Sequence, residues 1–288
     1  MKQLIYITTL IIWSAGLCSQ TIQDHVTHGH PEGTLIAIGG GGNDISLIKE
    51  FKKYAGGDTA RIVIIPTAQP DDYLLKDSSF SEIKHGFELA GFKDITIIHT
   101  RDTILANDEQ FIAPLKTATG LFFTGGRQWR IADGFLNTRA YEEMFRLLDR
   151  GGVIAGTSAG ATIQGSYLAR GDTRNNQIMM GDHETGLGFI TNIAIDQHVL
   201  ARNRQFDMFD ILENRPELLG VGIDENTAIV VKADTLEVIG KSYVLIYDKS
   251  FWSREGSELK HLPEENKLYY FLRAGDQYNL AERKVIEK

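Results

Sequence analysis

The chain has 288 residues, enough for one large α/β domain or two small ones, and its 42% hydrophobic and 24% charged residues are ordinary for a globular protein. A formal net charge of −8 and the lack of a long basic run argue against a surface that binds nucleic acid. Cys18 is the only cysteine, so an intramolecular disulfide is excluded, and a catalytic cysteine is excluded within the mature domain.

The first segment differs from the rest of the chain. Lys2 is followed by an apolar run from Leu4 to Leu17 and then by Cys18, Ser19 and Gln20, which is typical of a secretory signal peptide. The run is shorter than the roughly 20 apolar residues that span a membrane. We expect residues 1–19 to be a signal peptide and the mature protein to be periplasmic or extracellular. Lipidation of Cys18 is the alternative.

Residues 20–33 are polar and contain His25, His28 and His30. Clustered histidines can bind a metal, but no cysteine and few carboxylates accompany these three. We interpret the segment as a solvated linker that precedes a single domain of residues 34–288.

Continuous apolar runs that alternate with helical patterns follow the linker. This alternation predicts a doubly wound, mostly parallel sheet, in which ligands bind at the carboxyl ends of the strands. Loops rich in glycine and polar residues would converge there. The sequence predicts strands at 34–38, 61–66, 95–98, 121–124 and 153–155, helices at 45–54, 73–90 and from 109, and strand-end loops at 39–44, 66–69 and 125–128.

Four glycines, then Asn43 and Asp44, directly follow the first predicted strand. A strand, a glycine loop and a helix can cradle a phosphate. This loop lacks both the Gly-Lys-Ser/Thr of a P-loop and the GxGxxG spacing of a dinucleotide site. We therefore interpret residues 39–44 as a loop that allows close backbone approach beside an active site.

Gly156-Thr157-Ser158-Ala159-Gly160 ends the strand at 153–155, and helical character follows, which we expect to continue over 161–168. Strand, Gly-x-Ser-x-Gly and helix are the context of a nucleophile elbow, in which the serine occupies a strained turn. The alternative is a Gly/Ser-rich turn that only caps a helix.

Gly125, Gly126, Arg127 and Gln128 follow another buried strand. The glycines can expose a backbone N–H toward Ser158, which would complete an oxyanion hole with the N–H of Ala159. Gln128 can hydrogen-bond substrate. The alternative is an ordinary start of a helix over 128–136.

A strand at 193–196 ends in Asp196, Gln197 and His198, a suitable place for the general base of Ser158. The apolar runs 219–224 and 227–231 are typical of a hairpin, with Glu225 at its tip, where a carboxylate can orient the imidazole. A structural histidine and a solvated turn acid are the alternatives. Short strands at 236–239, 243–247 and 268–272 predict an antiparallel C-terminal extension of the same domain.

Taken together, these motifs resemble those of the cyanophycinase/dipeptidase E family of serine peptidases, whose flavodoxin-like fold is similar to class I glutamine amidotransferases. The resemblance covers about residues 34–250 and rests on residues 35–44, 123–128, 156–161, 196–198 and 222–228. It implies that Ser158 is the nucleophile, His198 the base and Glu225 the orienting acid. It also implies that Gly126 and Ala159 donate to the oxyanion.

The same resemblance implies a set of substrate-binding residues: Gln128, Asp196, Gln197, Arg202 and Arg204. Guanidinium groups bind carboxylates bidentately, which suits an aspartyl substrate. A serine mechanism needs no metal or cofactor, so we expect none. Two positions depart from the family pattern: Arg127 stands where an acid is common, and Asp207 stands near the place of a third arginine.

The implied function is that of an exported serine exopeptidase acting on β-aspartyl linkages. Its expected substrate is cyanophycin, a poly-aspartate with arginine on the side chains, and its products are β-Asp-Arg dipeptides. We expect no nucleic-acid partner and no membrane contact beyond a lipid anchor, with a homodimer as an option. Two alternatives stay open: an isoaspartyl or Asp-X dipeptidase with the same three residues, and a non-catalytic binding protein.

Overall fold

The computed structural model describes residues 28–41, 45–258, 261 and 267–287. The predicted signal peptide, His25 and most of the predicted linker lie outside these residues. Within them, no helix is long and apolar enough to cross a membrane.

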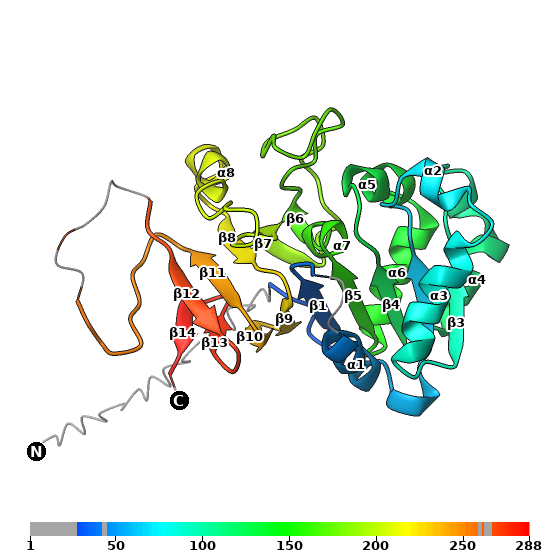
Figure 1. Ribbon diagram of the computed structural model, residues 1–288, viewed down its shortest axis with the longest axis horizontal. Helices are drawn as coiled ribbons and strands as arrows, with labels where there is room; N and C mark the ends of the chain where they lie inside the picture. The colour runs from blue at the N-terminus through cyan, green and yellow to red at the C-terminus, as the bar shows by residue number, and fades with distance from the viewer. Residues whose placement is uncertain (1–27, 42–44, 259–260, 262–266, 288) are drawn as a thin grey trace, which may run out of the picture.

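The larger of two sheets has nine strands in the order β14-β13-β10-β9-β1-β5-β4-β2-β3 (Figure 1). The five strands from β1 to β3 in this order are parallel, and the other four are antiparallel to their neighbours. The bounds are β1 Thr34–Ile38, β2 Arg61–Ile65, β3 Asp94–Ile97, β4 Gly120–Phe123, β5 Val153–Thr157, β9 Thr227–Lys232, β10 Thr235–Gly240, β13 Gln277–Asn279 and β14 Lys284–Ile286.

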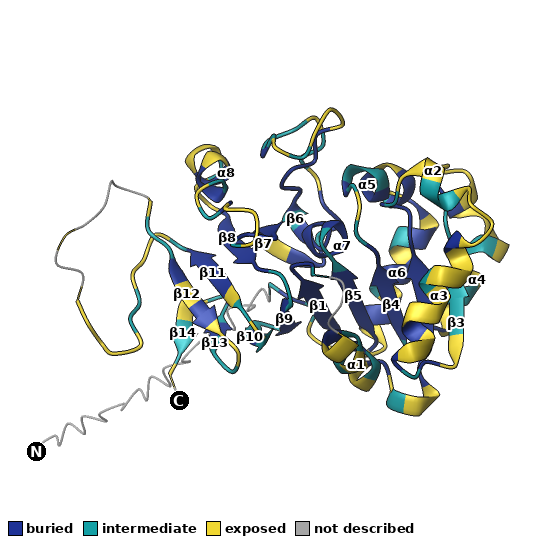
Figure 2. Ribbon diagram, viewed as in Figure 1, coloured by how far each residue is buried: buried dark blue, intermediate teal, exposed yellow. Residues whose placement is uncertain are grey.

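Helices cover both faces of the parallel part, which explains why its central strands are apolar throughout (Figure 2). On one face, Phe51 of α1 and Phe87 of α3 pack against Phe122 of β4, with ring centroids 5.5 and 4.9 Å apart. The helical elements are α1 Ile45–Tyr54, α2 Asp71–Leu74, α3 Ser79–Leu89, α4 Glu109–Thr117, α5 Trp129–Phe135, α6 Arg139–Asp149, α7 Ala159–Thr162, α8 Met208–Asn214 and the 3₁₀ turns Gly57–Thr59 and Leu105–Asn107.

The smaller sheet has five strands in the order β12-β11-β8-β7-β6. One of its faces shares a core with the larger sheet, and α8 packs against the other. Its strands are β6 Gly165–Tyr167, β7 Ile190–Gln197, β8 Leu219–Ile223, β11 Tyr243–Tyr247 and β12 Tyr270–Arg273. The large, partly parallel sheet flanked by helices confirms the predicted α/β class, and the second sheet was not predicted.

The second sheet corrects two expectations. The helix expected over 161–168 ends at Thr162, because residues 165–167 pair with β7 instead. The expected hairpin is wrong as well, because β8 and β9 belong to different sheets. Glu225 therefore lies at the corner where the chain crosses from the smaller sheet to the larger one.

The predicted C-terminal extension is divided in the same way. β10, β13 and β14 extend the larger sheet, whereas β11 and β12 pair with β8. The helix expected over 73–90 is split into α2 and α3.

The end of the predicted linker contacts the domain. The N–H of Gly29 donates to the carbonyl of Ala233 at 3.0 Å. His30 accepts the N–H of Gly33 at Nδ1, so its Nε2 carries the proton and donates to Asp149 at 3.0 Å. These bonds give His30 a tethering role.

Candidate active site

Ser158 occupies a sharp turn between β5 and α7. Its backbone has φ 55° and ψ −113°, a conformation that residues other than glycine rarely adopt. A Cβ on Gly156 would lie 2.2 Å from the carbonyl oxygen of Gly160, and one on Gly160 would lie 2.3 Å from that of Phe123. Both glycines are needed because the turn packs backbone directly on backbone.

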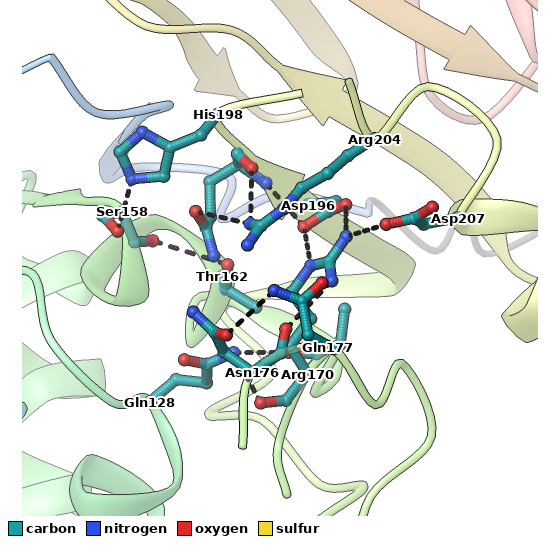
Figure 3. A network of polar contacts seen from close by, with 12 residues as sticks. Gln128, Ser158, Thr162, Arg170, Asn176, Gln177, Asp196, His198, Arg204 and Asp207 are labelled. Carbon is teal, nitrogen blue, oxygen red and sulfur yellow. Dashed lines mark hydrogen bonds and ion pairs between the residues drawn. The ribbon is translucent and has the colours of Figure 1, made fainter. Parts of the chain in front are cut away.

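A chain of two hydrogen bonds links Ser158, His198 and Glu225. His198 Nε2 lies 2.9 Å from Ser158 Oγ, and its Nδ1 lies 2.6 Å from Glu225 Oε1 (Figure 3 shows the first contact). An ionised carboxylate only accepts, so Nδ1 donates to Glu225 and Nε2 is left to accept the Ser158 hydroxyl. This tautomer is the one that a general base for Ser158 requires.

The surroundings of His198 favour its neutral form. Its side chain is 9% exposed, and that of Glu225 is 34% exposed. Burial lowers the pKa of His198, and the positive charge of Arg202 lowers it further, while the hydrogen bond to Glu225 raises it. The net direction is below the ordinary histidine value, so the imidazole is a neutral acceptor near neutral pH.

Consecutive carbonyls at the end of β1 and in the loop after it hold the backbones of all three segments. Each carbonyl accepts one backbone N–H. The donors are Ser158, His198 and Asn226, the residue that follows Glu225. The pairs are Ile38 with Ser158 at 2.9 Å, Gly39 with His198 at 2.9 Å and Gly40 with Asn226 at 3.0 Å. The loop approaches the site closely, as predicted, and its backbone, with the end of β1, holds the segments of Ser158, His198 and Glu225 in place.

Asp224, which sequence reasoning passed over in favour of Glu225, fixes the turn after His198. Its Oδ1 accepts the N–H groups of Leu200 and Ala201 at 3.0 and 2.8 Å. Its Oδ2 accepts the hydroxyl of Ser242 at 2.6 Å. A buried acid directly after an apolar strand was the available signal. The carboxylate ties the His198 turn to the corner that carries Glu225.

The backbone N–H groups of Gly126 and Ala159, near Ser158, are among those without an acceptor in the described residues. Gly126 has φ 135°, and a Cβ there would lie 2.1 Å from the carbonyl oxygen of Ala68. Only glycine fits this position. Free N–H groups beside a nucleophile are what an oxyanion hole requires.

Arg170 is at the centre of a buried network of polar contacts, and the sequence placed it only in a long polar loop. Its guanidinium is fully buried and holds both oxygens of Asp196, at 2.7 and 2.9 Å (Figure 3). It also donates to Asp207 at 2.6 Å. The unexpected acid at 207 is thus a partner of Arg170. Asp196 is committed to this ion pair and does not extend freely toward a substrate.

The side chain of Gln128 also binds the segment that carries Arg170. It is buried, and its Nε2 donates to the carbonyls of Ala169 and Arg170 at 2.7 and 3.0 Å. Arg127 donates to the carbonyl of Asp172 in the same loop. Gln128 and Arg127 therefore support the loop that carries Arg170.

Arg204 is the buried predicted binding residue without a direct ion-pair partner among the described residues. It is 4% exposed and forms no ion pair with any described carboxylate. Nη1 donates to the backbone oxygen of Gln197 at 3.3 Å and lies 3.5 Å from its side-chain oxygen. Burial and the charge of Arg170 lower the pKa of Arg204. Arg202, in the same turn, is exposed. The charges of Asp196 and Asp207 act on Arg204 without a direct ion pair. A buried guanidinium without a direct partner favours an anionic ligand.

Metal-ligand geometry is not found within the described ranges: no group of three or more His, Cys, Asp or Glu side chains is placed to hold an ion. His28 binds Asp234 through its backbone N–H at 2.7 Å. His25 lies outside these ranges, so the cofactor expectation stays a prediction.

Known proteins resemble this chain in sequence, and a solved structure resembles it in fold. The model of peptidase family S51 matches residues 35–239. The cyanophycinase of Geminocystis herdmanii is 33% identical over 262 residues, which is 85% of this chain and 93% of that protein. The cyanophycinase of Trichormus variabilis is 32% identical over 273 residues, 88% of this chain and 87% of that protein. A crystal structure of a peptidase from an acI-B1 actinobacterium has a TM-score of 0.63 at 23% identity and covers 88% of this chain and 98% of that one, which bears on the fold.

Proposed function

The chain belongs to peptidase family S51 and is a serine-type peptidase, and from this premise we propose that Ser158, His198 and Glu225 are its catalytic residues and cyanophycin its substrate. The observation that carries the mechanism is the position of His198, which bridges Ser158 Oγ at 2.9 Å and Glu225 Oε1 at 2.6 Å. The relatives named cyanophycinase support the substrate.

The reaction runs in two halves. His198 Nε2 takes the hydroxyl proton of Ser158 while Oγ attacks the scissile carbonyl, and Glu225 stabilises the imidazolium that forms. The N–H groups of Gly126 and Ala159 bind the negative oxygen. The imidazolium then protonates the leaving amine as the scissile C–N bond breaks. The acyl group remains attached to Ser158 as an ester. Water hydrolyses this ester with His198 again as the base.

Arg204 provides the proposed carboxylate grip. Each aspartate of cyanophycin carries an arginine on its side chain, and the carboxylate of that arginine is free. A buried guanidinium without an ion-pair partner gains a charge-assisted bond when such a group enters. Arg202 adds a second positive charge at the rim. Asp196 and Gln128 have an indirect role, because they hold Arg170 and its segment in place. Gln197 positions Arg204 in the same way.

The direct test is incubation of the purified protein with purified cyanophycin, followed by mass analysis. We expect β-Asp-Arg dipeptides, and none from Ser158→Ala. Cleavage of isoaspartyl or Asp-X dipeptides without polymer turnover would favour the dipeptidase alternative. A fluorophosphonate probe separates enzyme from binding protein: labelling at Ser158 that requires His198 supports catalysis, and an unlabelled wild type opposes it.

Export is part of the proposal and rests on the composition of residues 1–19. Fractionation of cells that express the full chain tests it. Mature protein beginning near residue 20 in the periplasm or medium supports export, and an intact chain in the cytoplasm contradicts it.

A further inference from the structure

A cavity of about 300 Å³, whose wall includes Gly125 and Thr157 next to the nucleophile, opens near Ser158, and Arg204 is not part of its lining. It lies at the carboxyl ends of β1, β4 and β5, between α1 and α3, and Thr157 and Gly125 form part of its wall. A Cβ on Gly125 would lie 3.3 Å from the Cβ of Ser158 and 3.8 Å from its Oγ. The wall of the cavity is therefore in direct contact with the segment that carries the reacting serine.

Aliphatic and aromatic side chains form the largest part of the side-chain wall of the cavity. Leu47 and Ile48 come from α1, Ile83 and Phe87 from α3, and Phe122 from β4. Such a wall stabilises a hydrocarbon chain by removing it from water. The volume is at the lower end of the range for small-molecule pockets, which is the scale of one substrate side chain.

Gly86 keeps the mouth of this cavity open. It lies inside α3, where glycine is less favourable than any residue except proline. It lines the cavity, and a Cβ added there would meet nothing within 4 Å. Packing therefore gives no reason for a glycine at this position. A larger side chain would fit the fold and would take up space that a ligand needs.

Glu82 is the one charged residue among those that line the cavity. It precedes Gly86 by one helical turn, so both lie on the same face of α3. The hydroxyl of Ser78 donates to its Oε1 at 2.7 Å, and the hydroxyl of Tyr73 lies 3.5 Å from its Oε2. Glu82 forms no ion pair with any described cation. Its oriented carboxylate at the rim favours a positive group.

We infer that this cavity is the subsite for a substrate side chain with an aliphatic stem and a cationic end, such as a guanidinium, next to the scissile amide. The stem lies against Ile83 and Phe87, and the cation reaches Glu82. The inference rests on the proposed function, in which arginine accompanies every aspartate of the substrate. Arg204 then binds a carboxylate of the substrate, and Glu82 binds a cation.

Binding of two small probes tests the subsite without any peptide. Butylguanidinium and butylurea have the same shape, but only the first is charged. By calorimetric titration we expect the wild type to prefer butylguanidinium about fivefold, the scale of a partly exposed ion pair. Glu82→Gln should remove the preference. Glu88→Gln, a change of the same kind at an exposed position of α3, should keep it.

Gly86→Leu tests the cavity itself. It should weaken both probes at least about tenfold, because the new side chain occupies the mouth, and its melting temperature should not fall, because leucine is the better helix former. Equal binding of the two probes by the wild type would overturn the inference. So would unchanged binding by Gly86→Leu.

Hydrolysis separates this inference from the proposed function. If the binding pattern holds but cyanophycin is not cleaved, the subsite stands and the proposed substrate is wrong. If cyanophycin is cleaved and Glu82→Gln alters turnover of an arginyl substrate and of its citrulline analogue equally, the subsite is wrong and the proposed function stands.

Discussion

A Cβ on Gly40 would lie 2.1 Å from Cε1 of His198, so the loop after β1 packs its backbone directly on the imidazole ring. The neighbouring carbonyl of Gly39 accepts the N–H of His198 at 2.9 Å. The ring and the backbone of His198 are thus both positioned by two consecutive glycines. His198 itself has φ 55°, a strained conformation that such support stabilises.

Gly40→Ala should therefore impair catalysis more than folding. The new methyl group must push the imidazole away from Ser158, and a misplacement of about 1 Å is enough to lower the rate about 100-fold. The measurement is kcat/KM on cyanophycin beside a urea denaturation curve. Gly57→Ala is the matched control, since Gly57 also has positive φ, 64°, but a Cβ there meets nothing within 4 Å. Gly57→Ala should lose stability only. Full activity in Gly40→Ala would contradict the packing argument.

Ser158→Ala should abolish hydrolysis and leave the fold intact, because the change removes one oxygen from a turn whose glycines are unchanged. His198→Ala should be nearly as damaging, because the losses of residues that act as a unit do not add. The double variant should therefore be no less active than either single variant. Rates of dipeptide release measure both. Turnover within about tenfold of wild type in either variant would remove the proposed mechanism.

Local signals in the sequence predicted the parallel strands, the elbow and the glycine loop. Gly156, Ser158 and Gly160 mark their own turn, so no distant contact is needed to recognise it. The second sheet escaped prediction because an apolar run does not show which sheet it joins: β8 and β9 are consecutive in the chain but belong to different sheets. Tertiary pairing also overrides a short helical pattern such as 161–168.

The buried polar network of the cleft was predicted only in part. Arg170 lies in a polar loop with seven other charged or amide side chains between residues 170 and 188, and nothing local marks it as buried. Its role depends on Asp196 and Asp207, which are 26 and 37 residues away. Without that pairing, Asp196 and Gln128 looked like free ligands for a substrate.

The pH dependence of kcat/KM should report the pKa of His198. Neutral imidazole is the active form, so activity should fall as the pH drops through this pKa, which burial places below 6.5. Arg202 lowers the same pKa, so Arg202→Gln should move the acidic limb of the profile to higher pH. Glu225→Gln should move it to lower pH, because the hydrogen bond that raises the pKa is weakened. Arg146→Gln, on the distant helix α6, is the control. If the acidic limb of kcat/KM stays at the same pH in both Arg202→Gln and Glu225→Gln, this limb reports a group other than His198.

Arg170→Met should destabilise the protein strongly. It leaves the buried carboxylate of Asp196 without a partner, and breaking such a pair costs about 3–5 kcal/mol. Asp207→Asn should cost less than about 1 kcal/mol, since that carboxylate is 36% exposed. Adding Asp196→Asn to Arg170→Met should recover part of the loss, because the unpaired charge is removed. Urea denaturation measures all three, and equal losses for Arg170→Met and Asp207→Asn would mean that the buried pair does not carry the stability assigned to it.

Arg204→Ala tests how the substrate is recognised. Arg204 is buried with no ion-pair partner among the described residues, so it gains one only when an anion enters the cleft. Removing the partner of a buried carboxylate costs about 2–5 kcal/mol, and the low end of that range lowers kcat/KM on cyanophycin roughly 30-fold. A serine-reactive ester that lacks carboxylates should lose far less. Arg202→Ala, a loss of the same charge at an exposed position of the same turn, should have a smaller effect on cyanophycin. Equal losses on cyanophycin and ester, or no loss on either, would mean that Arg204 does not bind the substrate carboxylate, and a dipeptidase or another substrate class would then be the better assignment.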